Sequence, residues 1–72
     1  MSIVVTEIES IHGDAYRMIF YRCQDHLGAW HSYGPVITID PNFDAEAFKP
    51  TVAAKVAERL AENEAAGVIG NG

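Results

Sequence analysis

The composition of the chain changes abruptly at Asp40-Pro41-Asn42, and this break limits the fold more than any other feature of the sequence. The residues before it are rich in valine, isoleucine, threonine and aromatic side chains, whereas those after it are rich in alanine and glutamate. The first composition is typical of β-strands and the second of an amphipathic helix. Because 72 residues are too few for two cores, we expect one domain over residues 1–72 in which strands precede a helix.

Three strand-like segments precede the break. Turn residues separate them at about the ten-residue spacing of an antiparallel meander. The expected strands are Ile3–Ile11, Ala15–Gln24 and Ala29–Ile39. A helix packed on this meander gives the predicted fold class, α+β, with a three-stranded antiparallel sheet and one C-terminal helix.

Glycine and proline predict the geometry of the connections. Gly13-Asp14 can form a two-residue turn, in which the glycine would adopt a positive φ without steric cost. Asp25–Gly28 suits a four-residue loop that ends with its glycine in the left-handed region. Proline cannot donate to a ladder, so Gly34-Pro35 predicts that the third strand is an edge strand with a bend or bulge.

An apolar residue recurs at every fourth position after the break. This stripe predicts an amphipathic helix that packs on the sheet through Phe48, Val52, Val56 and Leu60. Asp44 is the expected N-cap and Gly67 the expected C-terminal stop. Since proline disfavours helical geometry in the residue before it, we expect a separate or kinked first turn and a regular helix from Pro50 to about Ala66.

Both faces of the predicted sheet carry apolar residues, although a single helix can cover only one of them. With the turns above, one face gathers Val4, Ile8, Ile19, Tyr21, Cys23, Trp30 and Val36. The other gathers Ile3, Val5, Ile11, Tyr16, Met18, Phe20, Tyr33 and Ile37. Either face could receive the helix, and a large apolar patch left uncovered usually marks an interface. The alternative is a sheet that twists around the helix and exposes aromatic residues singly.

We therefore expect the protein to act by packing on other copies of itself or on neighbouring proteins. The residues predicted in this interface are Tyr16, Met18, Phe20, Trp30, Tyr33, Val68 and Ile69. The last two belong to the glycine-rich tail, residues 67–72, which is predicted to be flexible unless a partner holds it.

Few residues of the chain are suited to catalysis or metal binding. Cys23, His26 and His31 have the spacing of part of a zinc site, but a structural zinc needs four ligands and the fourth is missing. The predicted register places the thiol and His31 on opposite faces, which also argues against a Cys/His nucleophile pair. Glu7 and Glu9 share a face as in an ordinary charged patch. We expect no catalytic residue, no metal, no cofactor and no small-molecule substrate, and therefore no enzyme.

The net charge of -5 has the wrong sign for binding nucleic acid or an anionic membrane. A sheet that reads the major groove of DNA would use Arg17, Tyr21, Arg22 and Trp30, but two strand arginines supply too few phosphate contacts. The acidic helix suggests the reverse function, a small inhibitor or regulator that binds a basic surface of a host protein as a nucleic-acid mimic.

The single cysteine cannot form an internal disulfide. No apolar run approaches the roughly 18 to 20 residues of a membrane span, and none forms the core of a signal peptide. Both features favour synthesis in the cytoplasm.

Strand, turn and helix signals follow one another in a characteristic order through residues 14–66. Arg22-Cys23-Gln24 ends a strand, Asp25–Gly28 follows as a turn, the next strand contains Gly34-Pro35-Val36, and Phe43-Asp44-Ala45 precedes an acidic alanine helix. This order resembles short proteins encoded among the structural genes of tailed bacteriophages. The resemblance implies a non-enzymatic virion subunit in the tail, neck, baseplate or capsid surface, made in the host cytoplasm, and it carries over no site residue.

Overall fold

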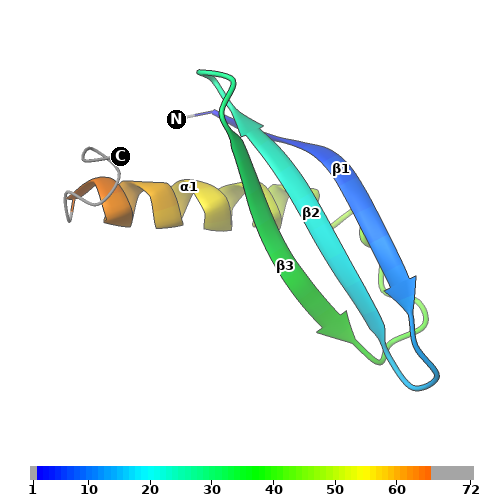
Figure 1. Ribbon diagram of the computed structural model, residues 1–72. Helices are drawn as coiled ribbons and strands as arrows, with labels where there is room; N and C mark the ends of the chain where they lie inside the picture. Colours follow the sequence, from blue (N-terminus) through cyan, green and yellow to red (C-terminus); the bar gives the residue numbers. More distant parts are fainter. Residues whose placement is uncertain (1, 66–72) are drawn as a thin grey trace.

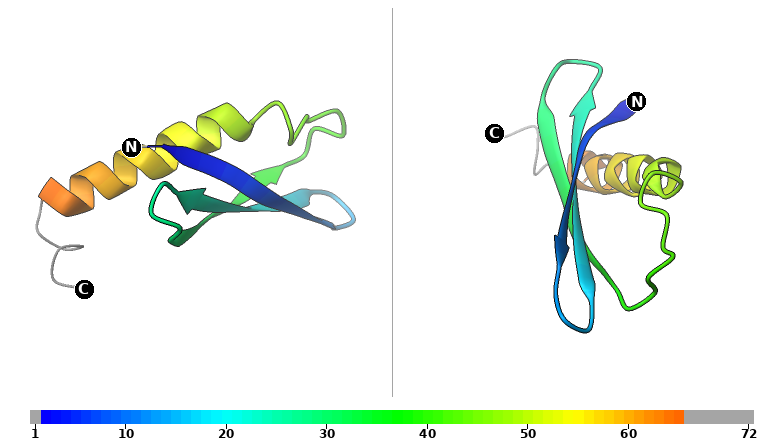
Figure 2. Two further views of the ribbon diagram at one scale, coloured as in Figure 1. Left: turned by 90° about the horizontal axis from the view of Figure 1, so that it is seen from above. Right: turned by 90° about the vertical axis from the view of Figure 1, so that its right-hand side faces the viewer.

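The computed structural model describes residues 2–65, which form three strands and one helix in the expected order (Figure 1). Strands β1 (Ile3–His12), β2 (Arg17–Asp25) and β3 (Trp30–Thr38) make one antiparallel sheet in the order β1-β2-β3. Helix α1 (Lys49–Ala65) crosses one face of this sheet (Figure 2). The predicted α+β meander with one helix is confirmed. No helix within residues 2–65 has the length and apolar character needed to cross a bilayer.

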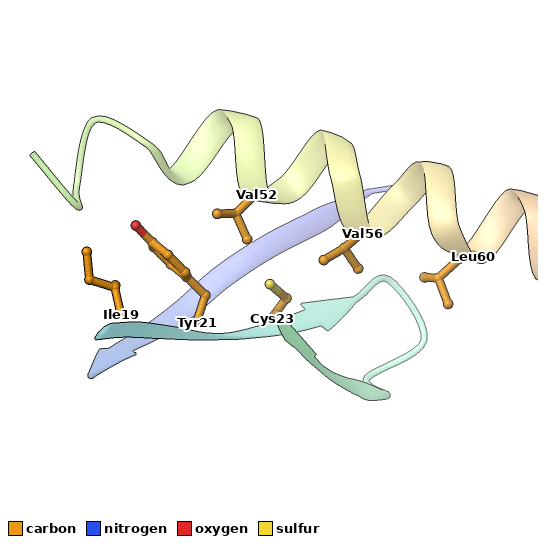
Figure 3. Packing of buried hydrophobic residues seen from close by; sticks show 6 residues of the cluster. All are labelled: Ile19, Tyr21, Cys23, Val52, Val56 and Leu60. Carbon is orange, nitrogen blue, oxygen red and sulfur yellow. The ribbon is translucent and has the colours of Figure 1, made fainter. Parts of the chain in front are cut away.

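The core forms where α1 lies over the middle strand. Six side chains from these two elements meet there, as Figure 3 shows: Ile19, Tyr21, Cys23, Val52, Val56 and Leu60. Phe48 packs at the edge of this cluster, with its ring centroid 6.2 Å from that of Tyr21. The predicted apolar stripe therefore faces the sheet along its whole length.

The helix begins after a separate turn, as the proline predicted. The carboxylate of Asp44 accepts a hydrogen bond from the backbone N–H of Ala47 at 3.1 Å, and Lys49 N–H donates to the carbonyl of Glu46 at 3.1 Å. Pro50 then lies in the first turn of α1, where its missing N–H is not needed. The predicted stop at Gly67 and the tail 67–72 lie outside the described residues.

A β-bulge at Thr6 changes which residues of β1 face the helix. The pairing with β2 shifts at this residue, and the Thr6 hydroxyl donates a hydrogen bond to the carbonyl oxygen of Arg22 at 3.1 Å. One extra residue reverses the alternation of side chains between the two faces. The prediction for the start of β1 is therefore wrong: Ile3 and Val5 pack against the core, and Val4 lies on the opposite face.

The hairpin between β1 and β2 is longer than expected. Four residues, Gly13–Tyr16, connect the strands, and the N–H of Gly13 donates to the carbonyl of Tyr16 at 2.8 Å. Gly13 does not adopt a positive φ, so the predicted two-residue turn at Gly13-Asp14 is wrong. The longer connection shifts the pairing of β2 with β1 by two residues. An even shift keeps each side chain near the hairpin on its predicted face.

The connection between β2 and β3 is displaced by one residue. It comprises His26–Ala29, because Asp25 remains in β2, and Gly28 adopts the predicted left-handed conformation with φ of 88°. A displacement of one residue exchanges the faces of the first half of β3. Tyr33 consequently packs against the core and Trp30 lies on the opposite face, which is the reverse of the predicted arrangement.

The predicted irregularity at Gly34-Pro35 is confirmed. The β2–β3 register shifts there, which restores the expected alternation and brings Val36 to the helix side. Gly34 has φ of 127°, and a Cβ on it would lie 2.7 Å from the carbonyl oxygen of Ile19. The bulge therefore requires glycine on two grounds, its backbone conformation and its close approach to β2.

Substitution of Gly34 by alanine should destabilise the fold through both effects. Gly28→Ala is the matched control, because it meets only a side-chain atom at 3.9 Å and loses only the roughly 1–2 kcal/mol of a left-handed backbone. Urea unfolding should show a larger loss for Gly34→Ala than for Gly28→Ala. Equal losses would show that the bulge accommodates a side chain.

Val56→Asp should abolish cooperative unfolding, because Val56 is fully buried and an unpaired carboxylate there costs several kcal/mol. Ala54→Asp places the same charge on the exposed side of α1 and should melt like the wild type. Thermal melts followed by circular dichroism would compare the two. A normal melt for Val56→Asp would mean that the stripe does not hold the helix on the sheet.

Candidate functional site

The side of the sheet turned away from α1 carries several exposed apolar side chains. We call it the open face, and its apolar residues are Val4, Ile11, Met18, Phe20, Trp30 and Ile37. Within residues 2–65 no segment packs on it, and the edge-on view in Figure 2 shows the helix on the other side. Val4, Trp30 and Ile37 are 58%, 51% and 62% exposed, so apolar side chains at both ends of this face are open to solvent.

Arg22 forms the centre of the open face. This residue projects from the middle strand between a carboxylate on β1 and an aromatic ring on β3. Its Nη1 lies 3.3 Å from a carboxylate oxygen of Glu7, and its guanidinium carbon lies 4.6 Å from the centroid of the Trp30 ring. Because both charged side chains are more than half exposed, the ion pair contributes about 0–1 kcal/mol to stability. The guanidinium also lies over the indole, and a cation–π contact at an exposed site contributes about 0.5–1 kcal/mol.

A hollow of about 600 Å³ lies beside this cluster. Its lining includes Glu7, Glu9, Ile11, Phe20 and Arg22. Glu9 pairs with Phe20 across the strands, so both side chains project from the open face, and both line the hollow. That carboxylate has no hydrogen bond or ion pair with any other residue from 2 to 65. The hollow therefore combines an apolar floor with one uncompensated negative charge.

The face of the sheet under α1, which we call the covered face, brings together three polar side chains: Cys23, Asp25 and His31. Cys23 pairs directly with His31, so the prediction that they lie on opposite faces is wrong. His31 Nε2 lies 2.9 Å from a carboxylate oxygen of Asp25. The other carboxylate oxygen accepts the N–H groups of Leu27 and Ala29 at 2.8 and 3.0 Å. These bonds, led by the one with His31, lower the pKa of the Asp25 carboxyl.

This arrangement is organised for structure and not for nucleophilic chemistry. The Cys23 side chain is fully buried and points toward α1 (Figure 3), and burial raises the pKa of its thiol. A thiol of this kind is protonated and shielded from any substrate. In the part of the chain that the structure describes, no three His, Cys, Asp or Glu side chains are placed to hold a metal ion.

The four residues of the DNA-reading alternative are divided between the two faces. Tyr21 donates its hydroxyl to the carbonyl of Ala45 at 2.9 Å, and Arg17 donates to the carbonyl of Phe43 at 2.7 Å. Both bonds tie the connection over residues 39–48 to the covered face. In the part of the chain that the structure describes, the open face keeps a single arginine, Arg22, for contact with phosphates.

The structure places the predicted interface residues in different environments. Three lie on the open face: Met18, Phe20 and Trp30. Tyr16 is half-exposed in the β1–β2 connection, and Tyr33 packs against the core. Val68 and Ile69 lie outside the described residues. The predicted interface omitted Val4, Ile11, Arg22 and Ile37. The predicted alternation already placed Ile11 and Ile37 on the face of Met18 and Phe20, whereas Val4 joins that face only because of the bulge at Thr6.

Comparison with known proteins yields no relative: no family model, curated protein or solved structure matches the chain. The function is therefore inferred from the geometry of the open face.

The Asp25–His31 pair predicts a dependence of stability on pH. Because the folded carboxyl has the lower pKa, the unfolded chain takes up a proton first as the pH falls below about 4, and the free energy of unfolding declines. Asp25→Asn should be less stable at neutral pH, and its stability should fall less between about pH 6 and about pH 3. Urea unfolding at several pH values would measure both effects.

Asp14→Asn is the matched control, since Asp14 lies in the other hairpin and makes no side-chain hydrogen bond with the described residues. It should follow the pH profile of the wild type. If Asp25→Asn followed that profile as well, the pair would have no part in the stability of the hairpin.

Proposed function

We propose that the protein is a non-enzymatic structural subunit that packs its open face against a neighbouring protein. The resemblance to phage structural-gene products suggests a tailed-bacteriophage particle as the setting. The observation that carries the proposal is the exposure of Val4, Ile11, Trp30 and Ile37 on one side of a three-stranded sheet. Val4 and Trp30 lie at one end of this face and Ile11 and Ile37 at the other, with Phe20, Glu9 and the Glu7–Arg22 pair between them. Apolar side chains left uncovered on one face of a sheet are typical of protein–protein interfaces.

The composition of the open face also supports an interface. Tryptophan, phenylalanine, methionine and arginine are enriched where proteins contact each other, and tryptophan and arginine often dominate the binding energy. The contact between Arg22 and Trp30 restrains the indole before a partner arrives. A restrained side chain loses less conformational entropy on binding, which favours association.

The acidic side of α1 supports a second candidate, an inhibitor that occupies a basic host surface. Glu58, Glu62 and Glu64 are exposed there, and none of them forms an ion pair with the described residues. Salt distinguishes the two functions. An apolar interface is maintained or strengthened at high ionic strength, whereas a charge-driven complex weakens as the Debye length shortens to about 3 Å at 1 M.

Substitution of Trp30 or Ile37 by alanine should weaken assembly about tenfold or more while leaving the fold intact, because both side chains are half-exposed or more. Leu27→Ala is the matched control, since Leu27 is 81% exposed but lies in the β2–β3 connection away from the open face. Sedimentation of the protein with the products of neighbouring genes would measure association.

Mass spectrometry of purified particles gives the direct test of the setting. We expect the protein in the particles, and we expect the Trp30→Ala variant to be depleted from them. Absence of the wild type from particles, with free protein in the infected cell and binding lost on Glu58→Lys and Glu62→Lys substitution, would favour the inhibitor.

A further inference from the structure

We infer that the open face binds a partner surface that presents a lysine or arginine side chain among apolar ones, and not a second copy of this chain. This inference rests on the proposed function and specifies the chemistry of the partner. Three observations carry it: the uncompensated carboxylate of Glu9, the hollow beside Phe20, and the single arginine of the open face, Arg22.

The charges of the open face are unequal. Among residues 2–65, the one cation of this face is Arg22, which is bonded to Glu7 and stacked on Trp30. Glu9 lies two residues along β1 from Glu7 on the same face, and it lacks a partner among the described residues. An occupant that covers this region without supplying a positive charge would bury a carboxylate unpaired, which is strongly unfavourable.

A second copy of the chain does not meet this requirement. It would bring another Arg22, Glu7 and Glu9, so the described residues of two open faces would supply two arginines for four carboxylates. Each copy also carries a net charge of -5, so two copies repel each other. A partner with a basic side chain instead neutralises Glu9 and gains a charge-assisted hydrogen bond.

The hollow has the chemistry that a long basic side chain needs. The methylene stem of such a side chain can lie on Phe20 and Ile11. Its charged end can donate hydrogen bonds to the carboxylates of Glu7 and Glu9, which also line the hollow. The ring of Phe20 can also face a guanidinium or ammonium group. The volume of about 600 Å³ is large enough for such a side chain.

A small-molecule probe tests this inference without knowledge of the partner. We would titrate the wild-type protein with hexylguanidinium and follow backbone amide shifts by NMR, with 1-hexanol and hexanoate as uncharged and anionic controls. We expect saturable shifts from hexylguanidinium on residues 7–11 and 18–22, with hexanol about two- to fivefold weaker and hexanoate weaker still. Equal binding of hexylguanidinium and hexanol, or no saturation by hexylguanidinium, would overturn the inference.

Glu9→Gln provides the variant that separates charge from shape. Because Glu9 is exposed, the loss of its charge should weaken hexylguanidinium binding about two- to fivefold and leave hexanol binding unchanged. Glu62→Gln, on the exposed side of α1, should change neither. Unchanged binding by Glu9→Gln, or shifts centred on α1, would contradict the proposed site.

Sedimentation of the wild-type protein alone tests the exclusion of a second copy. A monomer supports it, and a dimer that protects the open-face amides from exchange overturns it. If the probe fails while Trp30→Ala still weakens assembly, the proposed function stands and only the chemistry of the partner is wrong.

Discussion

The contact between the middle strand and one stripe of the helix determines the rest of this structure. Ile19, Tyr21 and Cys23 of β2 receive the buried residues of α1, and the peripheral residues of β1 and β3 pack around them. A three-stranded sheet has two faces, and one helix can bury only one of them. The fold therefore creates its core and its open face in the same step. Hydrogen bonds from Tyr21 and Arg17 then hold the connection before α1 on the covered face.

Two bulges on the edge strands decide which side chains belong to each face. The bulge at Thr6 places Ile3 and Val5 against the core. The bulge at Gly34-Pro35 allows Tyr33 before it and Val36 after it to face the core as well. Irregularities of this kind also disrupt regular pairing along free edges, which limits the addition of further strands there. The open face is therefore a better candidate for partner contact than the strand edges.

The sequence predicts the helix and the sites of irregular backbone, but not which side chains lie on each face of the sheet. The spacing of Val52, Val56 and Leu60 predicts the helix because many residues contribute to one periodicity. Gly28 and Gly34 mark positions that need a positive φ, and the structure confirms both irregular sites. Side chains alternate between the two faces along a strand, so a shift of one residue exchanges the faces. The one-residue displacement of the β2–β3 connection was therefore enough to misplace Trp30 and Tyr33. The existence of a second apolar face was predictable, but its membership required the register. Nothing local in the sequence marks Thr6 as a bulge.

The two faces use charged side chains for different purposes, and this difference separates stability from binding. On the covered side, Asp25 and His31 are largely shielded from solvent. Asp25 is hydrogen-bonded to His31 and to two backbone N–H groups of the adjoining connection, so substitutions there act on folding. On the open side, Arg22 and Glu7 are more than half exposed, and their contact adds little to stability. The same guanidinium lies over the ring of Trp30 and also lines the hollow. Substitutions on the open face can therefore alter what the protein binds while the core beneath the helix remains intact.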